Sequence, residues 1–130
     1  MVIDPSAILA IVYGEAEAET FLRLIGKSNL CLLSSPGYVE TSIVLGSRYG
    51  EKGVENLDLL LKELSITVVP FSPEQARLAT EAFLKFGKGR HPAKLNMGDC
   101  FSYGLAKAMG QPLLFKGNDF IQTDIGRVNY

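Results

Sequence analysis

The alternation of short apolar strands with amphipathic helices constrains this chain more than any other feature. Where strands alternate with helices along a chain, the strands pair in parallel through right-handed crossovers and the helices cover both faces of the sheet. The sequence therefore predicts an α/β fold with a central parallel sheet of four to five strands. The four clear strand candidates are residues 1–4, 30–34, 66–70 and 112–115, and residues 127–130 supply at most a short final strand.

The predicted helices carry start and stop signals as well as apolar residues at helical spacing. Pro5 and Pro36 each fit a first helical turn, Ser35 is expected to cap the helix that contains Pro36, and Gly110 closes the final helix. These signals separate the helices from the strands without a linker or a repeat. The helices are expected at residues 5–14, 16–27, 35–50, 54–64, 72–87 and 96–110.

Length and composition indicate one globular domain over residues 1–130. The chain has 130 residues, of which 47% are hydrophobic and 21% charged, enough apolar content for a real core. No apolar run is long enough to span a bilayer and no signal peptide is evident, so we expect a cytoplasmic protein that does not enter the membrane. Cys31 and Cys100 both lie in apolar surroundings and are expected to be reduced thiols rather than a disulfide.

Four acidic residues stand at the ends of predicted buried elements. Asp4 ends the first strand, Glu40 lies early in the helix that leaves the second strand, and Asp119 follows the fourth. Asp99 opens a helix that runs back toward the start of the fourth strand, so that its first turn lies at the same edge. Ligands of parallel sheets bind beyond the carboxyl ends of the strands, and we therefore expect all four acids to converge on one rim.

A cluster of carboxylates predicts a cation, because acids crowded together raise one another's pKa unless a positive charge neutralises them. An all-oxygen site suits Mg²⁺, which binds a few carboxylates together with water and phosphate oxygens. Zinc lacks its usual ligands here because His91 is the single histidine. The chemistry that such a site favours is hydrolysis of a phosphate ester by activated water.

A basic segment near the predicted rim is consistent with a nucleic acid substrate. Lys85, Lys88, Arg90 and Lys94 fall close together, where they could hold a phosphate backbone without reading sequence. A solvated loop is the simpler alternative, in which His91 would be exposed.

Each acid also has an ordinary structural explanation when it is taken alone. Asp4 could cap a helix, Glu40 could be a surface acid, Asp99 could complement a helix dipole and Asp119 could stabilise a turn. Ser6 is expected to cap the first helix rather than to bind a site carboxylate. Three further residues are expected to support local turns: Asn118, Thr123 and Asp124.

The sequence resembles the PIN-domain ribonuclease toxins of VapC type over nearly its whole length. The stretches that carry the resemblance are "MVIDPSAILAIV", "SSPGYVETSIVL", "NMGDCFSYGLAKAMGQPLLFKGNDF" and "TDI". The resemblance implies a three-layer α/β/α fold and endoribonuclease activity that depends on Mg²⁺, for which Mn²⁺ can substitute. It also implies a cognate VapB-type antitoxin, a homodimer, and toxin–antitoxin hetero-oligomers that bind operator DNA only through the antitoxin.

Carried over residue by residue, the resemblance assigns Asp4 and Asp99 as the principal metal ligands. Glu40 would complete the site through a water or a second ion, and Asp119 would be the fourth acid. Many relatives carry a further acid where this chain has Asn118, which leaves the affinity for a second ion open.

Two other functions and several features stay open from the sequence. A phosphoacceptor signalling domain of receiver type would want adjacent acids after the first strand, whereas Asp4 is followed by Pro5. A PIN-like module that binds RNA or a partner without cleaving it would be expected to lack an acid of the cluster. A last group of apolar residues could be buried in the core, pair with a second copy of the chain or bind an antitoxin segment: Ile11, Val12, Tyr13 and Leu22.

Overall fold

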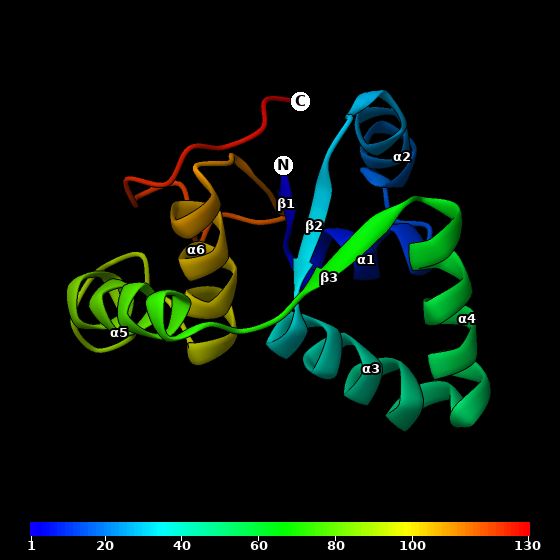
Figure 1. The fold of residues 1–130 in the computed structure, drawn as a ribbon, viewed down its shortest axis with the longest axis horizontal. Helices are drawn as coiled ribbons and strands as arrows, with labels where there is room; N and C mark the ends of the chain where they lie inside the picture. Colours follow the sequence, from blue (N-terminus) through cyan, green and yellow to red (C-terminus); the bar gives the residue numbers. More distant parts are fainter.

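The computed structural model describes residues 1–130 and contains a four-stranded sheet with helices on both sides (Figure 1). The strand order is β3-β2-β1-β4, and every neighbouring pair is parallel. This arrangement confirms the predicted three-layer α/β/α fold and its parallel sheet. The strands are β1 (Val2–Ile3), β2 (Cys31–Ser34), β3 (Ile66–Val69) and β4 (Leu113–Leu114).

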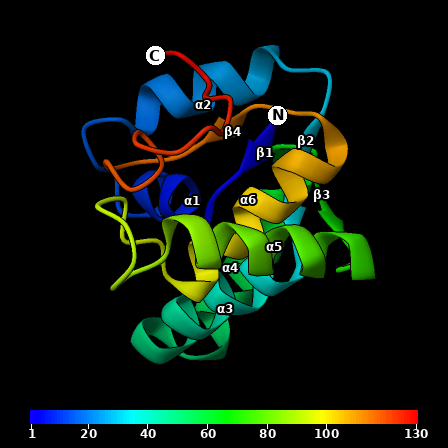
Figure 2. The same ribbon diagram turned by 90° about the vertical axis from the view of Figure 1, so that its left-hand side faces the viewer.

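Six helices surround the sheet. In Figure 1, α5 and α6 lie on one side of the strands, whereas α1, α2 and α4 lie on the other. Viewed from the first side, α5 lies in front of α6 (Figure 2). The helices are α1 (Pro5–Val12), α2 (Ala18–Lys27), α3 (Ser35–Tyr49), α4 (Glu51–Glu63), α5 (Pro73–Phe86) and α6 (Met97–Met109).

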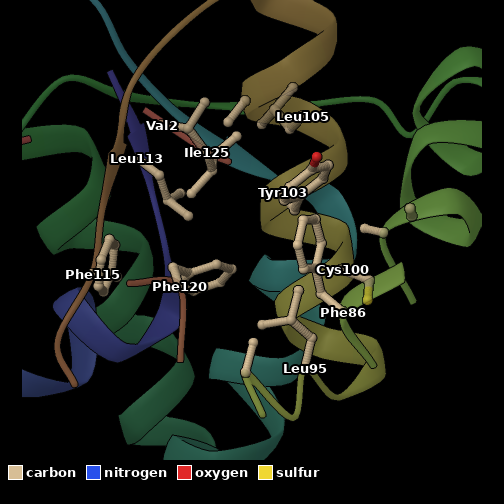
Figure 3. Packing of buried hydrophobic residues seen from close by; sticks show 14 of the residues in the cluster. Val2, Phe86, Leu95, Cys100, Tyr103, Leu105, Leu113, Phe115, Phe120 and Ile125 are labelled. Atoms are coloured by element: carbon tan, nitrogen blue, oxygen red, sulfur yellow. The ribbon is translucent and has the colours of Figure 1, made fainter. Parts of the chain in front are cut away.

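Successive strand residues pack into two separate cores, one on each face of the sheet. Val2, Leu32 and Leu113 face the core that α5 and α6 complete, part of which is drawn in Figure 3. The next residue along each of these strands packs into the opposite core, against α1 to α4. Burial on both faces explains why β1, β2 and β4 read as unbroken apolar runs rather than as an alternating pattern.

Two predicted helix caps are wrong by one or two residues. Ser34, not Ser35, caps α3, and its hydroxyl accepts a hydrogen bond from the Gly37 N–H. Asp4, not Ser6, caps α1. In both cases the cap has extended backbone and directly precedes the first helical residue: Ser34 is the last residue of β2, and Asp4 follows the last residue of β1.

Smaller differences concern the ends of elements. Helix α4 begins at Glu51, three residues earlier than predicted, because Gly50 separates it from α3 with a φ of 71°. Residues 127–130 form no strand, only an isolated bridge between Leu113 and Arg127. Cys31 and Cys100 are buried free thiols, as expected. No helix combines the length and the apolar character needed to cross a bilayer.

Candidate active site

Asp4 is the most deeply buried acid of the predicted site. It follows β1, one of the two central strands of the sheet, and is only 5% exposed. Its Oδ2 accepts a hydrogen bond from the Ser6 N–H at 3.0 Å, and its Oδ1 accepts one from the Ser102 hydroxyl at 2.5 Å. Burial raises the pKa of Asp4, while hydrogen bonds with Ser102 and Ser6 lower it and the charge of Asp119 raises it further. Asp4 is therefore both a helix cap and a member of the acid cluster.

Asp99 lies in the first turn of α6, where it forms a capping box with Asn96. The Asn96 side chain accepts from the Asp99 N–H at 2.8 Å, and the Asp99 carboxylate accepts from the Asn96 N–H at 3.0 Å. Burial is the largest of the causes that raise the pKa of Asp99 to about 7. Three other acids raise it as well, in the order Asp4, Asp119 and Glu40.

Glu40 reaches the cluster from α3 across the start of α6. Its carboxylate lies against Gly98, so closely that a Cβ at that position would be 2.8 Å from Oε1 and 2.9 Å from Oε2. Burial raises the pKa of Glu40, followed by the charge of Asp4. Although the residue is exposed at the surface, its carboxylate is therefore directed toward the other acids and does not extend into solvent like an ordinary surface side chain.

Asp119 completes the group from the exposed turn that follows β4. Its charge contributes to the raised pKa of both Asp4 and Asp99, which places the turn within electrostatic reach of them. The structure thus brings together the four acids named from the sequence, from four different segments, at the carboxyl edge of the sheet.

No basic side chain neutralises the four acids. Every ion pair in the structure involves other carboxylates: those of Glu15, Glu17, Glu55 and Asp124. No group of three or more His, Cys, Asp and Glu side chains is placed to hold a metal ion by itself. Mg²⁺ requires less than such a group, because it is usually held by one or two carboxylates together with several waters. The all-oxygen donor set fits a hard cation and excludes a structural zinc site.

The residues expected to support turns make no hydrogen bond with the four acids. The Thr123 hydroxyl donates to the Phe120 carbonyl, and the Asn118 carbonyl accepts from the Ile121 N–H. Asp124 accepts hydrogen bonds from the Tyr103 hydroxyl at 2.6 Å and from Lys107 at 3.1 Å. Asp124 thereby ties the C-terminal segment to α6.

The basic segment forms a loop closed by a bridge between Gly87 and Leu95. Lys88, Arg90 and Lys94 in the loop are exposed, as a backbone-binding loop requires, and so is Lys85 in the last turn of α5. His91, in contrast to expectation, is half-buried: its Nδ1 accepts from the Ala93 N–H, and its ring lies edge-on to Phe86 at 5.1 Å between centroids. The imidazole therefore helps to fix the conformation of the loop through its contacts with Ala93 and Phe86.

Sequence reasoning missed two residues that contact the site acids, Ser102 and Asn96. Asn96 had a detectable signal, since Asn followed three residues later by Asp resembles a capping box. Ser102 had only a weak one, a polar residue within the apolar pattern of α6, three positions after Asp99.

A family model for the PIN domain matches residues 1–126 of the chain. The chain belongs to the PIN-domain family. Ribonuclease VapC30 of Mycobacterium tuberculosis is 48% identical to this PIN-domain protein over 128 residues, which cover 98% of each chain. The family excludes the receiver-type alternative, and the identity with VapC30 confirms the predicted VapC-type endoribonuclease, the toxin of a toxin–antitoxin system.

Solved structures of the same fold belong to toxins. VapC20 of Mycobacterium tuberculosis, described as a toxin that cleaves the sarcin–ricin loop, matches with a TM-score of 0.78 and 18% identity, covering 99% of this chain and 98% of its own. VapBC2 of Rickettsia felis, bound to a DNA fragment from its promoter, matches with a TM-score of 0.77 and 17% identity, covering 99% and 97%. At these identities the likeness supports the fold.

Proposed function

We propose that this PIN-domain ribonuclease, acting as one domain over residues 1–130, hydrolyses RNA phosphodiester bonds with Mg²⁺, or with Mn²⁺ in its place. Asp4 and Asp99 would hold the ion directly, and Glu40 and Asp119 would complete the site through water or a second ion. The observation that carries the proposal is the convergence of four acids without a basic partner. A bound cation removes the repulsion that raises their pKa values.

The divalent ion would supply Lewis-acid stabilisation of the charge that develops on phosphate oxygens and would make a nucleophile of water at neutral pH. The chain's own residues prepare the site for it. Asp4 is kept in one orientation by hydrogen bonds to both carboxylate oxygens. Glu40 and Asp119 are more exposed, so they can accept hydrogen bonds from water at the rim and orient it toward the phosphate.

The basic loop is the proposed contact for the RNA backbone. Lys88 and Arg90 lie on its exposed part, between the bridge residues that close it. Phosphate contacts of this kind supply affinity and orientation without sequence information. Recognition of a particular RNA would then depend on unpaired loops that can enter the site.

A groove between α1, α3 and α4 is the proposed site for a cognate VapB-type antitoxin. It has a volume of about 450 Å³, and Val12, Leu45 and Leu57 contribute to its lining. An amphipathic antitoxin helix could place its apolar face there, as in other helix-in-groove complexes. Operator DNA would be bound through the antitoxin in such a complex. Of the other early apolar residues, Leu22 is exposed, while Ile11 and Tyr13 are partly buried against the core.

A homodimer is proposed for the face formed by α3 and α6. Met97 is 70% exposed and Ile43 62%, and both line a groove beside Glu40. Large apolar side chains gathered at one face of a protein favour contact with another chain. We propose that the toxin acts in the cytoplasm, where it would meet both RNA and an antitoxin encoded alongside.

The deciding experiment is cleavage of total cellular RNA by the purified protein. We expect cuts with Mg²⁺ or Mn²⁺, no cuts with EDTA, and no cuts by the Asp99→Asn variant, with product ends mapped to identify the RNA. A protein that binds RNA but makes no metal-dependent cuts in the absence of antitoxin would instead be a PIN-like binding module.

A further inference from the structure

The Ser102 side chain connects two segments that each carry a proposed metal ligand. Its hydroxyl donates to Asp4 Oδ1 at 2.5 Å, across 98 residues of sequence and in the buried interior. Ser102 itself is only 1% exposed. A hydroxyl–carboxylate bond of this length is at the short end of the range for O–H···O⁻ pairs, which are roughly twice as strong as neutral ones.

The position of Ser102 on α6 relates it to the second acid. It follows Asp99 by three residues, so both side chains lie on neighbouring turns of one helix face. Helix α6 thus carries Asp99 and, one turn later, the hydroxyl that donates a hydrogen bond to Asp4. The remaining hydrogen bond of Asp4, from the Ser6 N–H two residues away, is local and cannot orient Asp4 relative to α6.

We propose that Ser102 is a positioning residue for metal binding: it holds the Asp4 carboxylate in a fixed orientation relative to Asp99. This inference rests on the proposed metal-dependent function. A partner that orients a metal-binding carboxylate typically contributes 10- to 100-fold to metal affinity. Without the hydroxyl, Asp4 Oδ1 loses its only donor from α6, and the carboxylate can rotate away from the orientation that it shares with Asp99.

The neighbouring residue offers a matched control. Tyr103 is the next residue on α6, and its hydroxyl also donates to a carboxylate, that of Asp124, at 2.6 Å. Tyr103→Phe and Ser102→Ala therefore each remove one hydroxyl–carboxylate bond from the same helix. Only the second bond involves an acid of the cluster, so a loss of stability alone would affect both variants, whereas a loss of metal orientation would affect Ser102→Ala alone.

The test is Mn²⁺ binding to the purified protein in the absence of RNA. Binding is measured by electron paramagnetic resonance and by the rise in Tm on adding Mn²⁺. We expect Ser102→Ala to bind Mn²⁺ about 10- to 100-fold more weakly than the unaltered chain. Tyr103→Phe should bind it as the unaltered chain does, although both variants have a lower Tm in metal-free buffer. Ser102→Thr, which keeps the hydroxyl, should recover most of the affinity.

The outcomes separate this inference from the function beneath it. Equal Mn²⁺ affinity in Ser102→Ala and the unaltered chain would overturn the positioning role and leave the proposed ribonuclease mechanism intact. Equal weakening by Tyr103→Phe would also overturn it, since a general loosening of α6 would then be the cause. If the unaltered chain and Asp99→Asn both failed to bind Mn²⁺, the metal-dependent function would fall together with the role of Ser102.

Discussion

The Glu40 carboxylate on α3 lies directly against the backbone of Gly98 at the start of α6. A methyl group at position 98 would come within 2.8 Å of Oε1 and 2.9 Å of Oε2, closer than nonbonded atoms approach. The atoms in the way are the far end of a flexible side chain, so Glu40 rather than a helix would move. The absence of a side chain at this glycine therefore gives a site acid access to the cluster.

We predict that Gly98→Ala separates activity from stability. The substitution should displace Glu40 and lower the cleavage rate by about tenfold, since a misplaced catalytic group commonly costs one to two orders of magnitude. Stability should be unchanged or raised by up to about 1 kcal/mol, because alanine favours a helix over glycine. Cleavage assays and urea unfolding measure the two effects. Gly26 on α2 is exposed and has open space around its backbone. Gly26→Ala is therefore a control and should leave cleavage unchanged.

Asp4→Asn and Asp99→Asn should each abolish cleavage without unfolding the protein. A loss of about 100-fold or more is expected, because electrostatic stabilisation by a bound ion contributes several kcal/mol to the transition state. Asparagine can retain the capping hydrogen bonds that both residues accept from backbone N–H groups. Circular dichroism and RNA cleavage test this prediction, and a variant that had lost its helical signal would contradict it.

The raised pKa of Asp99 predicts an unusual pH dependence of stability for the metal-free protein. Its pKa is about 7 in the folded state and 3.8 ordinarily, so between these values the folded chain binds more protons than the unfolded chain. The contribution of Asp99 to the free energy of unfolding should therefore fall as pH rises from about 4 to 7. Asp4 and Glu40, whose pKa values are also raised, act in the same direction.

Thermal unfolding with EDTA at pH 5 and at pH 8 measures this effect, and Asp99→Asn should reduce the difference. Mg²⁺ should raise Tm more at pH 8 than at pH 5, because the ion competes with protons for the same carboxylates. A metal-free Tm that rises steadily between pH 4 and 7, with no change in Asp99→Asn, would contradict the assignment of Asp99 to a crowded acid cluster.

Neutralising the basic loop should weaken RNA binding without affecting the metal site. In the double variant Lys88→Gln/Arg90→Gln, the slope of log Kd against log salt concentration should decrease by about 1.4, since each contact with single-stranded phosphate contributes about 0.7. The exposed pair Lys52 and Glu55 on α4 provides a control position, Lys52→Gln. If the salt dependence stayed the same, the loop would not be part of the RNA-binding surface.

Much of the fold and the rim of acids could be predicted because parallel topology imposes both. Once strands alternate with helices, residues that follow strands must collect at one edge, which is why Asp4 and Asp119 could be placed together from sequence. Asp99 could be placed there too, because its helix runs back toward the start of the next strand.

Contacts that depend on how helices cross could not be predicted in this way. Nothing in the local sequence indicates that Gly98 would face Glu40, since that contact is set by the packing of α3 against α6. Ser102 looked like any polar residue in a helix, although it bonds a carboxylate 98 residues away. The cap of α3 fell on Ser34 rather than Ser35 because pairing of Ser34 with Val69 fixes where β2 ends.

The strand order has a consequence for when the four acids can meet during synthesis of the chain. Among the strands, β4 pairs only with β1, so Asp119 can take its place near Asp4 only after β4 has docked beside the first strand. A nascent chain that has not yet brought residue 119 out of the ribosome therefore cannot assemble all four acids. The candidate site forms only after the sheet has closed on its β4 side.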